Sequence, residues 1–404
     1  MTTGTPGTDS GILVTVRESP FAVKALLAGV LVNKLGAFLQ VFLVLFMTSR
    51  EFSDVQGGTA LGVYGAGSVL GVLLGGTFAD RIGPRLTIVH GMTGTAVLLL
   101  GVLYVHVYWA LLVAVFAVGV ISQLYRPAAA VLLAELTPEH RQVMVFALYR
   151  LALNLGTTGA PVVGALLLTV SYDVLFWGEA LASLAYAGIA LLALPRGVSA
   201  TATPVEGRSG GYAAVLADRR FAAYLVAMLI NSAVYVQYLG TLPLAMRDAG
   251  LEVFWYGVVV AVNGAVVICF ELLMTKVVQR WPMRVVLGVG FTLLGGGLAL
   301  YALPGGLAVF VIGTLMWSLA EIIEGPTMFA YPAQAGPEHL RGRYLGSAHA
   351  MFGVGAALGP VVGVALWVRL GPTSWLVFGA ASVLALIPAF YGVRPARAAP
   401  SGGN

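Results

Sequence analysis

The chain has 404 residues, of which 59% are hydrophobic and only 10% are charged, and its net charge is +5. A soluble domain is about half apolar and about a quarter charged, so this composition excludes an ordinary soluble domain and indicates a chain surrounded mostly by lipid. The basic excess does not indicate nucleic-acid binding, because Lys and Arg lie in short segments between apolar runs and form no stripe.

Apolar runs of about 20 residues or more recur along the chain, which is the length that crosses a bilayer as a helix. We therefore expect an all-α membrane protein with twelve spans. They are placed at residues 22–48, 58–80, 86–105, 109–134, 142–170, 174–194, 220–246, 255–278, 283–303, 307–333, 343–369 and 373–393. Residues 1–19 lack the basic-then-apolar order of a cleaved signal peptide, so the first span is expected to be an uncleaved anchor.

The positions of Lys and Arg predict the orientation. If the N-terminus is cytoplasmic, 16 of the 22 basic residues fall on the cytoplasmic side and three on the other. This is a strong positive-inside bias. We expect a multi-pass protein of the cell membrane (the inner or plasma membrane) with both termini in the cytoplasm.

An internal repeat with an offset of 199 residues relates the two halves. Pro127 aligns with Pro326, and the tetrapeptide Pro-Val-Val-Gly occurs at 161–164 and again at 360–363. Each half holds six spans and so enters the membrane in the same orientation, a parallel repeat typical of transporters with the substrate site between the repeats. The Ser-, Thr-, Pro- and Gly-rich stretch 195–218 is expected to be a cytoplasmic linker between bundles 1–194 and 219–404.

The loop between spans two and three has the sequence Gly-Thr-Phe-Ala-Asp-Arg-Ile-Gly-Pro-Arg, residues 76–85. It resembles the signature loop of the major facilitator superfamily, with Pro84 in place of a usual basic residue. The resemblance implies the major facilitator fold, with twelve transmembrane helices in two pseudo-symmetric six-helix bundles. Gly83 suits a tight turn. A conformational latch is predicted from Gly76, Asp80, Arg81, Gly83, Arg85 and, in the next cytoplasmic loop, Arg141; alternatively the arginines only set the topology.

Small residues recur at helical spacing in spans two, five and eleven, where they let helix backbones approach closely. The pattern in span five resembles the Gly-rich antiporter motif of drug exporters, with Ala160 where Gly is usual. A special role in antiport and ordinary helix packing are both open. The helix-packing candidates are Gly156, Pro161, Gly164, Gly355, Gly359, Pro360 and Gly363.

Charged side chains inside a bilayer are costly, so each one is a candidate for function. Span ten places Trp317, Glu321, Glu324 and Met328 on one helical face. Two carboxylates one turn apart repel each other, and apolar surroundings disfavour charge, so one of the pair is expected to hold a proton near neutral pH. The alternative is an internal ion pair with Arg126 or Lys34.

The segment from Ala320 to Pro326 also resembles a stretch in span ten of the twelve-span drug:proton antiporters. In that family the glutamate, here Glu321, serves proton coupling and cation recognition. We assign proton coupling to Glu321, Glu324 and Glu271. Other relatives carry a basic residue at the position of Val115 and acids at those of Tyr149 and Leu239, so coupling here must depend mainly on the second half.

The resemblance further implies that spans one, four, seven and ten line a central cavity, and span five adds a polar face. The candidates for this substrate cavity are Lys34, Gln40, Arg126, Arg150, Asn154, Tyr235, Tyr238, Trp317 and Met328. The charges in the spans are mainly cationic in the first half and acidic in the second, which also suits a zwitterionic substrate.

These features predict a proton-driven antiporter that exports small amphipathic compounds or drugs by alternating access. The alternative is a proton-coupled symporter for a zwitterionic or anionic metabolite or peptide, and a membrane sensor without transport is a remote one. An enzyme is disfavoured, because no nucleophile–base or metal constellation is found. We expect a monomer with protons, a small molecule and the lipid bilayer as partners, no nucleic acid, no metal and no cofactor.

Overall fold

A computed structural model describes residues 17–196, 212–337 and 340–393 of the chain. These residues form helices and no strand. The predicted cytoplasmic termini and most of the predicted linker lie outside the described residues.

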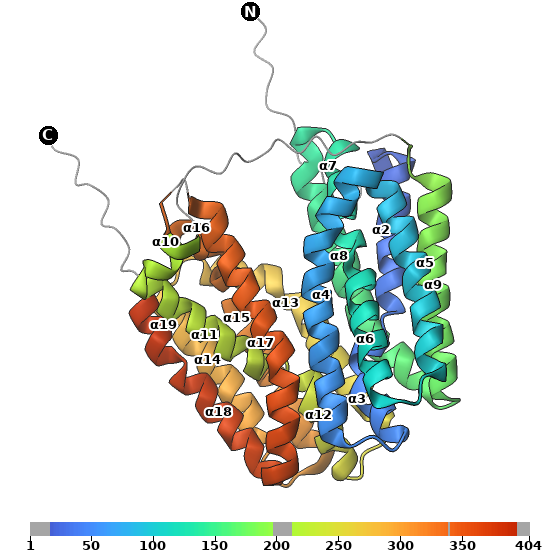
Figure 1. Ribbon diagram of the computed structural model, residues 1–404. Coiled ribbons are helices and arrows are strands. Elements are labelled where there is room, and N and C mark those ends of the chain that lie inside the picture. Colours follow the sequence, from blue (N-terminus) through green and yellow to red (C-terminus); the bar gives the residue numbers. More distant parts are fainter. Residues whose placement is uncertain (1–16, 197–211, 338–339, 394–404) are drawn as a thin grey trace, which may run out of the picture. The chain divides into compact units, whose positions relative to one another are not determined.

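The helices of the first half follow one another through short turns (Figure 1). They are α2 (Phe21–Leu35), α3 (Leu39–Ser49), α4 (Asp54–Ile82), α5 (Pro84–Tyr104), α6 (Tyr108–Gln123), α7 (Tyr125–Glu135), α8 (Glu139–Leu168) and α9 (Tyr172–Ala193).

The second half repeats this order. It contains α10 (Tyr212–Ala217), α11 (Arg219–Tyr235), α12 (Gln237–Asp248), α13 (Val253–Val278), α14 (Met283–Leu300), α15 (Gly306–Ala330), α16 (Pro332–Ala335), α17 (Arg341–Leu370), the 3-10 turn η2 (Gly371–Thr373), α18 (Ser374–Leu384) and α19 (Leu386–Gly392).

The predicted spans coincide with these helices. Eleven stretches among the described residues are long and apolar enough to cross a membrane, and the last of them, Arg343–Gly392, is 50 residues long. That last stretch contains α17 and then α18 with α19, separated by η2, so it holds the two spans predicted there. The prediction of an all-α membrane protein is therefore confirmed.

Local sequence explains where the helices begin and break. Gly83 has a φ of 86°, the left-handed region that favours glycine, and Pro84 opens α5, so the predicted tight turn after α4 is confirmed. The Ser171 hydroxyl accepts from the Val174 N–H and caps α9, and Asp218 caps α11 in the same way. Span one breaks at residues 36–38 and span seven at Val236.

Contacts between Cα atoms group the chain into two compact units. The first unit is Met1–Leu39 with Gly67–Thr203, and the second is Gln40–Ala66 with Pro204–Asn404. The first half's α3 and the start of α4 thus pack with the second unit. The predicted bundle limits, 1–194 and 219–404, stay a prediction.

Equivalent helices pair in the same way inside each unit. In the first, α2 packs on α8 and α9, and α5 packs on α9; in the second, α11 packs on α17 and α19, and α14 packs on α18. Figure 1 shows α2, α5 and α9 side by side, and likewise α11, α14 and α18. The internal repeat is therefore a repeat of packing as well as of sequence.

Glycines stand where the paired helices approach most closely. A Cβ atom on Gly156 of α8 would lie 2.4 Å from the Lys34 Cβ atom of α2, and one on Gly355 of α17 would lie 2.4 Å from the Leu229 carbonyl of α11. Gly359 approaches Ala233 and Gly363 approaches Gln237 at similarly short range. Pro161 and Pro360 lie inside α8 and α17, and Gly164 is buried. Small residues let these backbones meet.

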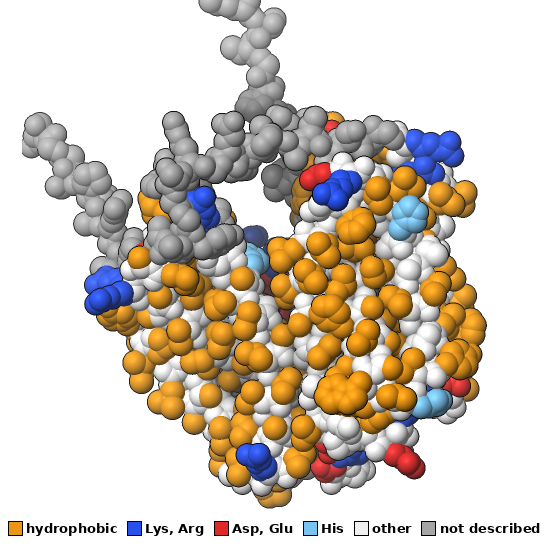
Figure 2. Space-filling model, in the orientation of Figure 1, with side chains coloured by type: hydrophobic (Ala, Val, Ile, Leu, Met, Phe, Trp, Pro, Cys, Tyr) orange, Lys and Arg blue, Asp and Glu red, His pale blue; other side chains and the backbone are white. Residues whose placement is uncertain are grey.

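The flanks of the units are apolar. Leu73, Trp109, Leu192 and Ile387 are each at least 69% exposed in the protein alone. Figure 2 shows hydrophobic side chains over the visible face of each unit and charged side chains gathered at the helix ends. A lipid bilayer is the medium that covers such apolar belts.

Candidate functional site: two polar clusters in the helices

The first cluster surrounds Glu321 of α15 in the second unit. Its Oε2 atom accepts a hydrogen bond of 2.8 Å from the Asn263 amide of α13, and the Tyr235 side chain of α11 is close enough to interact with it. The same Asn263 amide donates to the Ser318 hydroxyl at 3.1 Å. Glu321 is therefore a half-buried acid held by a neutral donor, and it forms no ion pair within the described residues.

Three aromatic rings stand beside this carboxylate. Tyr235 and Tyr238 meet edge to face at 5.3 Å, Tyr235 meets Trp317 in the same way at 5.7 Å, and Tyr238 stacks on Trp317 at 5.5 Å. The Trp317 indole donates to the Tyr301 hydroxyl, which fixes the ring. Aromatic faces next to a carboxylate are a recognition surface for an organic cation.

Glu324 lies one turn further along α15 and is only 5% exposed. Its Oε1 atom accepts a hydrogen bond of 2.8 Å from the Asn231 amide of α11, whereas its Oε2 atom has no partner among the described residues. Gly290 of α14 makes room for this carboxylate, since a Cβ atom there would lie 2.3 Å from Oε2. The predicted acid pair is thus divided between two sets of partners.

The second cluster lies in the first unit at the break in span one. The Glu179 carboxylate of α9 is 8% exposed, and its Oε2 atom accepts the backbone N–H groups of Phe38 at 3.0 Å and Leu39 at 2.6 Å. These N–H groups belong to the start of α3, so the carboxylate replaces the hydrogen bonds that the broken helix lacks. Glu179 therefore stabilises a discontinuous span.

Two cations accompany Glu179. The Lys34 ammonium lies 5.7 Å from the centre of the Tyr125 ring and is influenced by the charges of both Arg126 and Glu179. Arg126 follows Tyr125 in α7 and is exposed in the protein alone. Lys34 and Arg126, both predicted cavity residues, are therefore brought together.

The other predicted cavity residues are scattered. Gln40 is exposed and belongs to the second unit, although Lys34 of the same span belongs to the first. Arg150 is exposed and Asn154 is half-buried on α8. Met328 is buried, with its sulfur 3.6 Å from the Asn231 amide. Glu271 is half-buried on α13, and its charge influences Glu321.

The predicted latch is unpaired in this structure. Asp80 and Arg81 are exposed, and Asp80 has no ion pair within the described residues. Arg85 donates to the carbonyls of Ala190 and Leu191 at the end of α9. Arg141, expected near Asp80, forms an ion pair with Glu18 instead. A Cβ atom on Gly76 would meet no atom within 4 Å.

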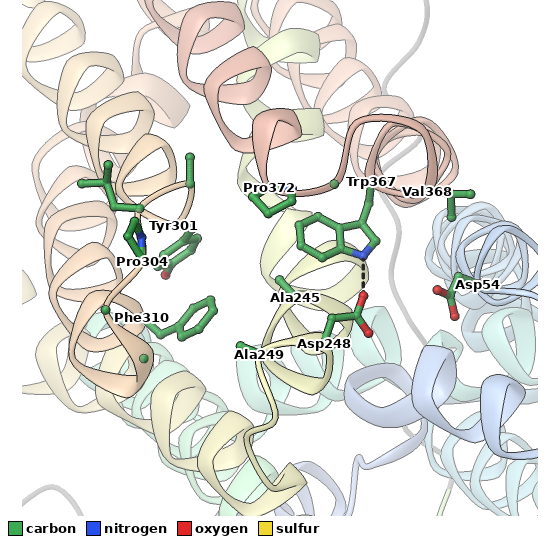
Figure 3. Close-up of a pocket in the computed structure, with 15 residues that line it drawn as sticks. Asp54, Ala245, Asp248, Ala249, Tyr301, Pro304, Phe310, Trp367, Val368 and Pro372 are labelled. Atoms are coloured by element: carbon green, nitrogen blue, oxygen red, sulfur yellow. Dashed lines mark hydrogen bonds between the residues drawn. The ribbon is translucent and has the colours of Figure 1, made fainter.

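A cavity of about 720 Å³ opens at one end of the second unit. Figure 3 shows the Trp367 indole donating to Asp248, with Asp54 nearby and with Tyr301, Pro304 and Phe310 on another wall. Arg247 donates to both oxygens of Asp54, at 3.1 and 3.0 Å. None of the residues predicted for the substrate cavity lines it.

Several residues of these clusters were not assigned a role from the sequence. Asn263, Ser318 and Gly290 are common residue types in membrane helices, so only their contacts distinguish them. Tyr125 could have been found, because the 199-residue offset aligns it with Glu324. Within the described residues no group of three His, Cys, Asp or Glu is arranged to hold a metal ion.

The arrangement of paired helices, with a discontinuous span and buried charges in each repeat, is that of a secondary transporter. The family model described as Major Facilitator Superfamily matches residues 26–360. The chain therefore belongs to the major facilitator superfamily, and it is a multi-pass membrane transporter.

Relatives with described activities are distant. The chain is 23% identical over 379 residues to a Na(+), Li(+), K(+)/H(+) antiporter of Planococcus maritimus, with 85% of this chain and 88% of that one covered. It is 26% identical over 394 residues to the multidrug resistance protein MdtH of Klebsiella pneumoniae, with 91% and 94% covered. A solved structure of the nucleoside transporter NupG has a TM-score of 0.78 at 16% identity, covering 91% of this chain and 98% of that one, which shows the fold.

Proposed function

We propose that this chain is a proton-coupled antiporter that exports small amphipathic compounds across the cell membrane by alternating access. The observation that carries the proposal is the Glu321 carboxylate beside the rings of Tyr235, Tyr238 and Trp317. A half-buried carboxylate in a membrane span that accepts a hydrogen bond from a neutral amide can exchange a proton for a cationic ligand, because either one neutralises it. The resemblance to MdtH supports export of drugs.

Glu324 complements this site. It is buried, and one of its oxygens has no partner among the described residues, so a proton on that oxygen removes the cost of an isolated charge. In the proposed cycle the two acids take protons from the outer side, release the exported compound there, and lose the protons to the cytoplasm. The chain works as a monomer with both termini in the cytoplasm, and the proton gradient takes the place of any cofactor.

The experiment is transport into inverted membrane vesicles whose interior is acidified. An antiporter accumulates an added quaternary ammonium dye, which cannot be trapped by protonation, inside the vesicles and releases protons, which a pH-sensitive dye reports. Glu321→Gln should abolish both signals while the protein remains inserted and folded, and Glu252→Gln, an exposed acid before α13, should keep both. The proposal fails if the proton gradient does not change the accumulation of the compound, or if the Glu321→Gln variant transports at the full rate. A symporter would not accumulate a compound added outside under this gradient.

Exchange of monovalent metal cations is a second candidate. The antiporter of Planococcus maritimus is among the relatives, and the Glu321 carboxylate and the Ser318 hydroxyl, which both accept from the Asn263 amide, supply oxygen ligands in one place. The same vesicles decide between the candidates: release of protons on addition of NaCl or KCl, without any organic cation, would favour metal-cation exchange.

A further inference from the structure

The polar cluster of the first unit has more positive charge than its own acid can balance. Lys34 and Arg126 influence each other as like charges, and Glu179 is the acid that attracts Lys34. The Oε2 atom of Glu179 is already engaged by the N–H groups of Phe38 and Leu39. Two cations beside one carboxylate, of which one oxygen is already engaged, leave a positive excess in segments that span the membrane, where unbalanced charge is unfavourable.

Hydroxyl groups without acceptors lie in the same cluster. The hydroxyls of Tyr125 and Tyr186 are buried and have no hydrogen-bond partner among the described residues. The two rings meet edge to face at 5.6 Å, and Arg126 influences the phenols of both Tyr125 and Tyr149. Buried hydroxyls are normally satisfied, so unsatisfied ones beside two cations indicate a place for an acceptor.

We propose that Lys34 and Arg126 form an anion-binding subsite in the first unit, which takes the carboxylate group of an amphipathic compound. A guanidinium binds both oxygens of a carboxylate, and an ammonium adds a second charge-assisted bond. The carboxylate supplies the charge and the acceptor atoms that the cluster lacks. Binding at this subsite does not depend on the proposed function. Only the statement that the bound compound is transported depends on it.

Equilibrium binding to the full-length purified protein tests the subsite without any proton gradient, so its failure and the failure of antiport are distinguishable. The probes are benzoate, its neutral analogue benzamide, and chloride at the same ionic strength, and the readout is the thermal unfolding midpoint. Benzoate should raise the midpoint saturably, whereas benzamide and chloride should not. Equal stabilisation by benzoate and benzamide, or by benzoate and chloride, overturns the carboxylate assignment.

Substitutions in the subsite test whether benzoate binds there. Arg126→Gln and Lys34→Gln should weaken benzoate binding at least tenfold, and Arg126→Lys should retain part of it because the charge remains. Arg369→Gln, an exposed cation at the end of α17 in the second unit, is the matched control and should bind like the unaltered protein. Unchanged benzoate affinity in Arg126→Gln overturns the proposal. If that variant does not fold, the comparison of the three probes on the unaltered protein still decides.

Discussion

The polar cluster of the first unit holds two cations, three tyrosines and a carboxylate that caps a broken helix, whereas the cluster of the second holds two carboxylates bonded to amides. The backbones repeat, since α2 packs on α8 as α11 packs on α17. The side chains at equivalent positions do not: Tyr125 aligns with Glu324, Arg126 with Gly325, and Glu179 with Phe378. The two copies thus share their packing but carry opposite excess charge in their polar clusters.

From this contrast we propose that protons are exchanged in the second unit, and the variant with the largest expected effect tests this proposal. Glu324→Gln keeps an oxygen for Asn231 but cannot release a proton, so we expect coupled transport to fall by at least about 100-fold, as when a positioned proton-transfer group is removed. Proton release from vesicles on addition of substrate measures it. If Glu179→Gln in the first unit removed proton release while Glu324→Gln did not, the contrast would be reversed.

The second test concerns stability in the first unit. Glu179→Ala removes the acceptor of two backbone N–H groups at the start of α3, which should cost about 2–5 kcal/mol of the free energy of unfolding. Glu179→Gln retains an acceptor oxygen and should lose much less. Thermal unfolding of the purified protein measures both.

The control for that test lies on the same helix. Asp173 is exposed in the first turn of α9, and Asp173→Ala should cost at most about 1 kcal/mol because only the helix dipole loses a partner. Equal destabilisation by Glu179→Ala and Asp173→Ala would show that the cap on α3 contributes little.

The repeat relates two glycines, and their substitution tests the difference between the units with a smaller expected loss of stability. A Cβ atom on Gly290 would lie 2.3 Å from the Glu324 carboxylate, whereas one on Gly91, the equivalent residue of the first unit, would come no closer than 3.4 Å to the Ile121 carbonyl. Gly290→Ala should therefore cost about 1–3 kcal/mol through overpacking, and Gly91→Ala should be close to neutral. Unfolding midpoints of the two variants, measured side by side, would refute this if they shifted equally.

The smallest effects are expected for the ion pairs at the ends of the units. Arg247 pairs with Asp54 in the second unit and Arg141 with Glu18 in the first, and all four side chains are at least 23% exposed. Exposed pairs contribute at most about 1 kcal/mol, so Arg247→Gln and Arg141→Gln should each lower stability by no more than that, and less at high salt. A cost of several kcal/mol at high salt would show that one pair is a structural lock.

Some predictions from the sequence needed only local information. The twelve spans followed from apolar length, and the turn at Gly83 followed from the freedom of glycine next to Pro84. The pairing of Arg141 with Glu18 did not follow, because ion pairs at helix ends depend on which segments meet there. The division of Lys34 and Gln40 between two units was equally hidden, because it depends on the break at residues 36–38.

The sequence by itself determined the class of protein, the helices and the repeat. The length of the apolar runs, the spacing of the glycines and the 199-residue offset are all properties of the chain in its linear order. It also marked Lys34, Arg126, Glu321 and Glu324 as costly charges that require a reason. Only the tertiary structure decided what surrounds them: Asn263 and Tyr235 for Glu321, and Asn231 and the space at Gly290 for Glu324. The reason is physical, since the state of a buried charge depends on donors and space supplied by other helices, and no pattern along one helix specifies those neighbours.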